Sequence, residues 1–275
     1  MNRKIIAVCV LAFLFALVGY AEHPEKARVD RYSLTVVEYP DTAHTALPIG
    51  SINNKSDVVG YGWNRDDASF LYTIPFEWRN GVFTTLDFLE EWSGAMAYSQ
   101  NNRGDIVGAA RKEGYGDIPV LQVPLLWTQG VPQNLGLLPG DNTGWANAIN
   151  NRGLVAGTSA TAINASAVIP RPFVWQRGKM SPLLNPQSPL LIGEAACIND
   201  AGQIVGWFWD MAQNSGGPAL WEKGQLYVLD TLGGNSGVAQ DINNHGQAVG
   251  YAMTPDNVNH ACLWTKEGPL DLGTL

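Results

Sequence analysis

The sequence predicts an all-β fold of the β-propeller type with about five four-stranded blades, and three observations support this. A segment of ten residues recurs five times, a tryptophan followed by a glycine recurs once after each copy, and glycine, proline and asparagine are too frequent for helices of useful length. We expect one repeat domain over residues 32–275, preceded by a linker over 22–31.

The first repeated marker is an asparagine turn. The copies are SINNKSDVVG, SQNNRGDIVG, AINNRGLVAG, CINDAGQIVG and DINNHGQAVG, and their leading asparagines are Asn53, Asn101, Asn150, Asn199 and Asn243, spaced by 48, 49, 49 and 44 residues. Asparagine favours a turn closed by its own side chain, and the following glycine adopts positive φ without strain. Each copy therefore predicts a hairpin of two short apolar strands.

The second marker is a tryptophan on a predicted third strand, at Trp78, Trp127, Trp175, Trp221 and Trp264. Prolines at 75, 124, 172 and 218 are expected to open these strands, and glycines at 81, 130, 178, 224 and 268 to turn the chain into a fourth strand. Four strands in about 40–50 residues match one propeller blade. A large indole on each sheet is expected to pack against the neighbouring sheet.

The two ends of the chain leave the blade count open. Residues 32–40, YSLTVVEYP, look like a fourth strand, and so do the last residues, LDLGTL, so that six fourth strands accompany five hairpins. Two arrangements fit: a five-bladed ring with one surplus strand, or an incomplete, not fully closed larger ring whose missing parts lie in another chain or in a truncated gene.

The first 21 residues have the pattern of an export signal. Arg3 and Lys4 precede an apolar run from Ile5 to Val18, and a small residue, Ala21, ends the segment. The run is shorter than the roughly 20 residues that span a bilayer, so we expect cleavage after Ala21 and no stable membrane insertion. The predicted location is extracellular or periplasmic.

The charge of the chain excludes one class of partner, and its cysteine content indicates the state of the thiols. Without residues 1–21 the chain carries 15 Lys plus Arg against 25 Asp plus Glu, an acidic balance that repels phosphate backbones, so no nucleic-acid partner is expected. Only Cys197 and Cys262 remain, and their small apolar positions favour two buried free thiols over a disulfide.

The repeat pattern resembles that of the HAF-family extracellular repeat proteins of bacteria. The residues that carry the resemblance are A-x-x-I-N-x-x-G-x-x-V-G, the strand His260-Ala261-Cys262-Leu263-Trp264 and the L-G-T-L ending, and the likeness covers residues 32–275. Units one and two depart from it at Ser56 and Gln100. The resemblance implies export and a repeated β architecture, and it supplies no catalytic residue.

No cofactor, metal site or catalytic centre is predicted. The asparagine turns hold single carboxylates, where a calcium loop needs several, and the few histidines accompany no nucleophile motif. The alternative prediction is a secreted propeller hydrolase or lyase that acts on polysaccharide. Its candidate catalytic residues are four carboxylates in or near loops: Glu90, Glu91, Asp141 and Glu194.

The remaining tryptophans are the candidate ligand-binding residues. Aromatic side chains outside the repeat position can stack on sugar rings or anchor a protein partner, and they are Trp63, Trp92, Trp145, Trp207 and Trp209. The sequence therefore predicts an exported, non-catalytic repeat scaffold that binds an unknown protein or glycan.

Overall fold

The structure is a computed structural model that describes residues 37, 48–65, 71–112, 120–164, 166–185, 188 and 190–274. The predicted signal peptide, the linker and the predicted strand 32–40, apart from Val37, lie outside these residues. In the described ranges no helix is long and apolar enough to cross a membrane.

The described residues form five four-stranded antiparallel sheets, in chain order. Sheet one holds β1 (Ile49–Ile52), β2 (Val58–Arg65), β3 (Leu71–Arg79) and β4 (Val82–Thr85); sheet two holds β5 (Gly94–Gln100), β6 (Ile106–Lys112), β7 (Leu121–Thr128) and β8 (Val131–Asn134); sheet three holds β9 (Thr143–Ile149), β10 (Val155–Asn164), β11 (Ala167–Gln176) and β12 (Lys179–Pro182); sheet four holds β13 (Leu191–Ile198), β14 (Ile204–Asp210), β15 (Ser215–Glu222) and β16 (Gln225–Val228); sheet five holds β17 (Gly237–Ile242), β18 (Ala248–Met253), β19 (Asn259–Thr265) and β20 (Gly268–Gly273). Within each sheet neighbours in sequence are neighbours in space, as in a propeller blade.

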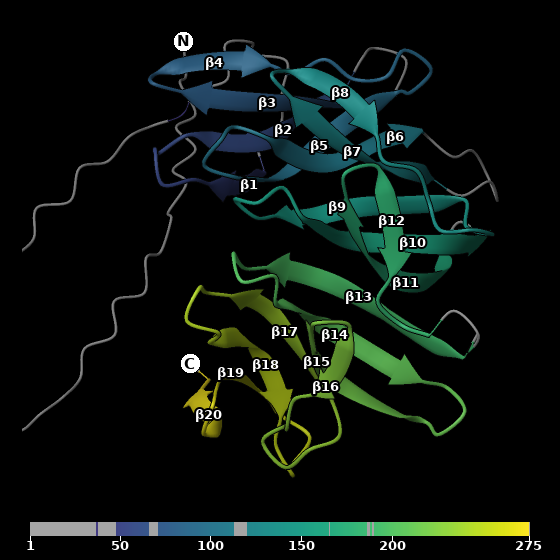
Figure 1. The fold of residues 1–275 in the computed structure, drawn as a ribbon, viewed down its shortest axis with the longest axis vertical. Coiled ribbons are helices and arrows are strands. Elements are labelled where there is room, and N and C mark those ends of the chain that lie inside the picture. Colours follow the sequence, from purple (N-terminus) through teal and green to yellow (C-terminus); the bar gives the residue numbers. More distant parts are fainter. Residues whose placement is uncertain are drawn as a thin grey trace, which may run out of the picture.

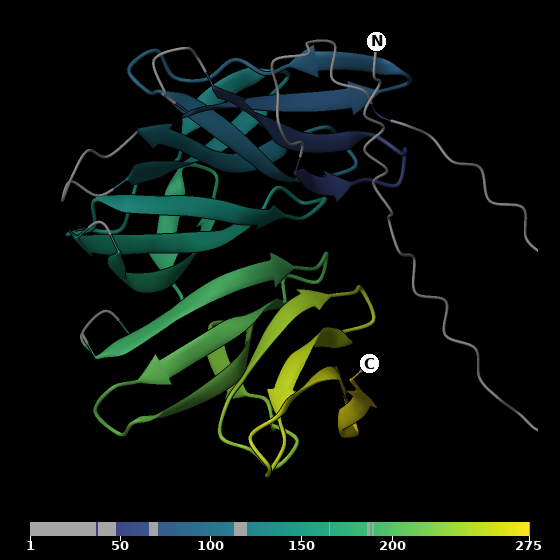
Figure 2. The same cartoon turned by 180° about the vertical axis from the view of Figure 1, so that it is seen from behind.

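The sheets succeed one another around a common axis in an open arc, with sheets one and five at its two ends (Figures 1 and 2). The first strands β1, β5, β9, β13 and β17 pack successively against one another and lie nearest the axis. Among the described residues, no strand of sheet five packs extensively against a strand of sheet one. The all-β, propeller-like prediction is confirmed, and the arrangement is the open one of the two alternatives.

Each asparagine marker closes the turn between the first two strands of its sheet. In sheet three, Oδ1 of Asn150 accepts hydrogen bonds from the backbone N–H groups of Arg152 and Leu154, both at 3.0 Å. The turn needs a positive φ, which Gly153 supplies at 80°. In sheet one Ser56 takes the same conformation at 65°, which explains how the turn persists without its glycine.

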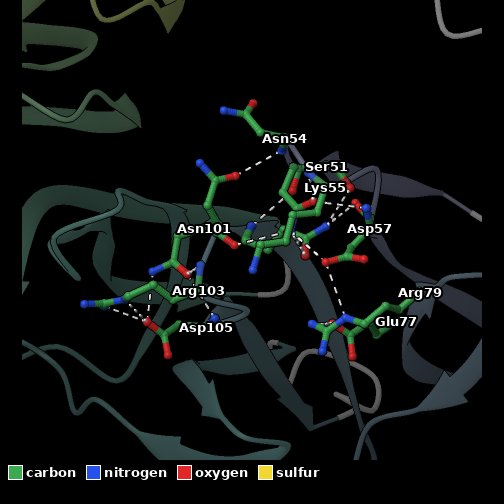
Figure 3. Close-up of polar contacts among 12 residues, drawn as sticks. Ser51, Asn54, Lys55, Asp57, Glu77, Arg79, Asn101, Arg103 and Asp105 are labelled. Atoms are coloured by element: carbon green, nitrogen blue, oxygen red, sulfur yellow. Dashed lines mark hydrogen bonds and ion pairs between the residues drawn. The ribbon is translucent and has the colours of Figure 1, made fainter.

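The same asparagines also join one sheet to the next. The side-chain N–H groups of Asn53, Asn101, Asn150 and Asn199 donate to the backbone C=O groups of Asn101, Asn150, Asn199 and Asn243, at 3.5, 3.2, 2.9 and 3.0 Å. A second row runs beside it: the backbone N–H groups of Asn54, Asn102, Asn151 and Asp200 donate to the side-chain Oδ1 atoms of Asn102, Asn151, Asp200 and Asn244, at 3.0, 2.8, 2.9 and 2.8 Å. We call these two rows the asparagine ladder; Figure 3 shows where it begins, at Asn54 and Asn101. The ladder runs in one direction, because each sheet donates to its successor.

The repeat tryptophans fill the spaces between sheets, as predicted. Trp127, Trp175, Trp221 and Trp264 are buried, and each packs against residues of the preceding sheet; Trp127, for example, shares a cluster with Val59. Trp78 is only half-buried, since no sheet precedes sheet one among the described residues. The indole N–H of Trp127 donates to the C=O of Asp87 at 2.6 Å, which ties the strand to the preceding loop.

The glycine that ends each repeated segment is required by a bulge in the first strand. The register of β5 against β6 shifts between Ala97 and Ser99, so one extra residue bends β5 towards its partner. A Cβ atom on Gly108 would lie 1.8 Å from the C=O of Met96. The equivalent glycines face equally close carbonyl oxygens, at 1.9–2.3 Å: Gly60, Gly157, Gly206 and Gly250.

The prolines do not open the third strands, so that part of the prediction is wrong. Pro124, for example, lies inside β7 and pairs with Ala109 of β6. Its C=O accepts the N–H of Leu135, which follows the end of β8. The proline nitrogen faces the same side, where β8 has ended, and so no ladder donor is missing.

Candidate binding site

Described residues line three cavities between consecutive sheets. The cavities between sheets three and four and between sheets four and five lie at the end of the sheets opposite the asparagine turns, where first and third strands begin and second strands end. The cavity between sheets two and three is lined mainly by the first strands β5 and β9. The cavity volumes are about 260 Å³ between sheets two and three, 270 Å³ between three and four, and 170 Å³ between four and five. The repeat thus places a hollow at the same end of two successive interfaces, and the third hollow lies elsewhere along the first strands.

The cavity between sheets four and five, which we call the aromatic cavity, holds two of the predicted residues. Trp207 and Trp209 alternate along β14, so both indoles are on the face turned towards sheet five. The cavity is lined by Trp207, Phe208, Trp209 and Gly217 from sheet four and by Ser236, Gly237, Val238 and Tyr251 from sheet five. Both indoles are partly exposed.

A glycine on the neighbouring strand makes room for one of these indoles. Gly216 pairs with Trp209 across β14 and β15, and a Cβ atom there would lie 2.8 Å from Cε3 of Trp209 and 2.2 Å from the C=O of Phe208. The Trp209 ring therefore lies against bare backbone, which fixes its position without a side-chain neighbour. The Gly216-Gly217 pair was not singled out from the sequence, although two glycines opposite two tryptophans were a usable signal.

A carboxylate lies beside the other indole. Glu194 on β13 pairs with Trp207 on β14. Burial raises the pKa of Glu194, and the neighbouring Trp207 side chain partly opposes that rise. The Ser236 hydroxyl lines the cavity, and the Glu194 carboxylate lies beside Trp207 but outside that lining; both groups can accept a hydrogen bond.

Trp145 belongs to a separate cavity, between sheets two and three. It lines that space with Tyr98, Gln122 and Asn147. The Tyr98 hydroxyl donates to Sδ of Met96 at 3.3 Å, and burial raises the pKa of Tyr98 above its ordinary value. The amide of Asn147 donates to the C=O of Ala195 at 2.7 Å, which links this site to sheet four.

Of the other two predicted tryptophans, Trp92 lines none of these cavities. Trp92 packs against the core cluster shared by sheets one and two, and its backbone N–H donates to Leu89. Trp63 lies in β2 opposite Thr73, and its side chain is outside the described residues. The five candidates thus do not form a single site.

The loop carboxylates proposed for polysaccharide cleavage are dispersed. Asp141 is almost fully buried and accepts hydrogen bonds from Ser159 (2.6 Å) and Thr161 (2.9 Å), and it pairs with Arg171 at 2.7 Å. This network ties the loop before β9 to β10 and β11, which is a structural task. Glu90 and Glu91 are exposed in the loop after β4, whereas Glu194 lies within sheet four.

The described residues contain no group of three or more His, Cys, Asp or Glu side chains that could hold a metal ion. The two cysteines among the described residues, Cys197 and Cys262, are free. Burial raises the pKa of Cys197 to about 12 and that of Cys262 to about 11, so neither thiol is a ready nucleophile.

The chain matches no model of a known protein family, and no curated protein sequence. Among solved structures it is similar to the β-propeller domain of the Trilobed protease from Pyrococcus furiosus, described as having an open velcro topology, with 9% identity, 84% of each chain covered and a TM-score of 0.45. It is also similar to the six-bladed, fucose-recognising lectin of Aleuria aurantia, with 9% identity, 83% of this chain and 80% of that chain covered, and a TM-score of 0.40.

Proposed function

We propose that the protein is an exported, non-catalytic binding module that holds one sugar ring of a glycan in the aromatic cavity between sheets four and five. The observation that carries this proposal is the meeting of Trp207, Trp209 and Ser236 around about 170 Å³ of open space. Pockets for drug-sized ligands are roughly 300–1,000 Å³, so this one suits a single small ring.

The chemistry of the cavity favours a carbohydrate over a peptide anchor. A sugar ring has apolar C–H faces that stack on indoles and hydroxyl groups at its edge that need hydrogen-bond partners. Glu194 and Ser236 supply acceptors beside the rings, and the acidic balance of the chain disfavours strongly anionic ligands. A neutral monosaccharide unit has an apolar face for the indoles, hydroxyl groups for the hydrogen-bond acceptors and no negative charge.

The test is a screen of neutral glycans on an array, followed by calorimetry on the best ligand with Trp209→Ala and with Trp145→Ala as the matched control in the other cavity. Loss of the stacking ring should weaken binding at least tenfold in Trp209→Ala, because burying one aromatic contributes about 1.5–3 kcal/mol, and Trp145→Ala should bind like the parent. Equal affinities in all three proteins would contradict the assignment of the cavity. Degradation of a polysaccharide by the purified protein, with no glycan bound, would favour the hydrolase or lyase alternative.

Export and membership of the HAF family are part of the same proposal, and they rest on the sequence alone. N-terminal sequencing of the protein recovered outside the cytoplasm should begin at Glu22. Retention of an intact residue 1–21 segment in the cell would contradict it.

A further inference from the structure

Sheet five exposes a face that is buried in every other sheet. The position that follows the turn and precedes the repeat glycine is fully buried in sheets one to four, at Val59, Val107, Ala156 and Val205. In sheet five the equivalent residue, Val249, is 39% exposed. In the other four interfaces this face packs under the tryptophan face of the next sheet.

The exposed face of sheet five is also more apolar than its position requires. Val249, Leu263 and Leu270 form one row across β18, β19 and β20, and Leu270 is 53% exposed. The position of Leu270 is held by Thr84, Gln133, Ser181 and Tyr227 in sheets one to four and is at least partly exposed in each, so the missing cover is shown by Val249 and not by Leu270. Contiguous apolar residues on an exposed sheet face indicate an interaction surface.

The opposite end of the arc exposes the complementary face. The residue before the leading asparagine is 6–7% exposed at Ile149, Ile198 and Ile242. The equivalent Ile52 in sheet one is 53% exposed. The arc therefore ends in two different halves of the interface that it builds four times internally.

The asparagine ladder is unfinished at the same two ends. In sheet five the Asn243 amide donates only within its own turn, to Gln247 at 2.9 Å, and the backbone N–H of Asn244 has no partner among the described residues. In sheet one the side chain of Asn54, which occupies the acceptor position, extends away from the ladder without a hydrogen bond to a described residue (Figure 3).

We infer that the opening between sheets five and one is a docking site for one further four-stranded sheet of this same repeat, carried by another polypeptide. Its tryptophan face would cover Val249 and Leu263, and its asparagine turn would receive the free N–H groups of sheet five. Its opposite face would cover Ile52, and its own turn N–H would reach Asn54. A single sheet meets both ends of the arc at once.

A whole second copy of this chain fits less well. It offers the same face through its own sheet one, but four more sheets follow that sheet and have to occupy the side of the opening where sheet one already lies (Figure 1). The occupant is therefore a single repeat unit with an Asn-Asn or Asn-Asp turn and a third-strand tryptophan.

The probe for the test is residues 190–235, the unit of sheet four, fused to a carrier protein and titrated against the full chain carrying Val249→Cys as a thiol-labelling reporter. Docking should slow labelling of the reporter at least tenfold, because the equivalent residues of sheets one to four are fully buried, and a probe carrying Trp221→Lys and Asn199→Ala should leave it unchanged. Leu263→Lys in the same reporter chain should abolish the protection by the intact probe. Because a lone unit can fail to fold, the same two probes are also appended after Leu275 through a flexible linker, where the high effective concentration favours docking.

Equal labelling with intact and damaged units in the tethered form would overturn the proposal. So would slow labelling of the full chain with no probe present, which would mean that its own residues cover the face, or protection that depends on dimerisation of the chain. A second tethered unit should add no further protection at Val249→Cys and no further gain in melting temperature, since the opening admits one sheet.

Discussion

Asn150 is the position where the asparagine ladder can be tested most directly. Its side chain makes three hydrogen bonds, two within its turn and one to the C=O of Asn199 at 2.9 Å, and the residue is 4% exposed. Asn150→Ala removes all three and leaves the partner groups in a buried setting. With about 1 kcal/mol for each lost hydrogen bond, the expected cost is about 3 kcal/mol of the free energy of unfolding.

Asn243→Ala is the matched control. Asn243 closes the same turn with its Oδ1 atom, accepting from His245 and Gln247, but it is exposed and donates to no further sheet. Water can replace its bonds, so the expected cost is about 1 kcal/mol or less. The difference of about 2 kcal/mol between the two losses in free energy of unfolding measures what burial and the hydrogen bond between sheets contribute at Asn150.

Thermal unfolding followed by circular dichroism measures both variants. For a chain of 150–250 residues, 1 kcal/mol corresponds to about 2–4 °C, so Asn150→Ala should melt about 4–8 °C below Asn243→Ala. Urea midpoints with an unchanged slope would confirm that the effect is on stability. Equal melting temperatures for the two variants would refute the idea that the ladder holds successive sheets together.

Three further predictions concern single side chains. Trp127→Phe should lose about 1–3 kcal/mol more stability than Trp221→Phe in urea unfolding, because the Trp127 N–H donates to Asp87, whereas the buried Trp221 N–H has no partner among the described residues; equal losses would contradict this. Gly108→Ala should destabilise by more than about 3 kcal/mol, since its Cβ atom would meet the C=O of Met96 at 1.8 Å, while Gly217→Ala, with its nearest neighbour at 3.9 Å, should melt like the parent. Burial raises the folded-state pKa of Glu194 above its ordinary value of 4.5, so its stabilising contribution is present below that value and lost as the pH rises through the folded pKa. Glu194→Gln should therefore melt above the parent at pH 7, and the gap should shrink as the pH falls through the folded pKa towards 4.5; a gap independent of pH would show that ionisation is not the cause.

The repeat period made most of the fold predictable. Five asparagine turns and five tryptophans at matching spacing determined the number of sheets, their antiparallel hairpins and the burial of Trp127, Trp175, Trp221 and Trp264 between them. The positions of the prolines were predicted wrongly, because a proline is also tolerated inside a strand where its nitrogen points to a side at which the neighbouring strand has already ended. That β8 ends before it reaches Pro124 of β7 is visible only in the structure.

The candidate site was predictable only in part. Trp207 and Trp209 were identified as candidates because they lie outside the repeat, yet Trp92 has the same sequence character and packs against a core cluster. Trp207 and Trp209 meet Ser236 because sheet five packs beside sheet four, and Trp145 meets Tyr98 because sheet two packs beside sheet three. These contacts depend on how the sheets are arranged in space, which the sequence pattern does not specify.

The sequence by itself determined what is local and periodic: the turn chemistry of each asparagine, the strand order within a sheet and the need for an apolar partner on each sheet face. Only the tertiary structure decided what depends on the rotation from one sheet to the next: the direction of the asparagine ladder, the interfaces that keep a cavity, and the unpaired faces at Ile52 and Val249. The physical reason is that hydrogen bonds and periodicity within a unit are encoded over a few residues, whereas the angle between sheets results from packing summed over residues almost 50 positions apart.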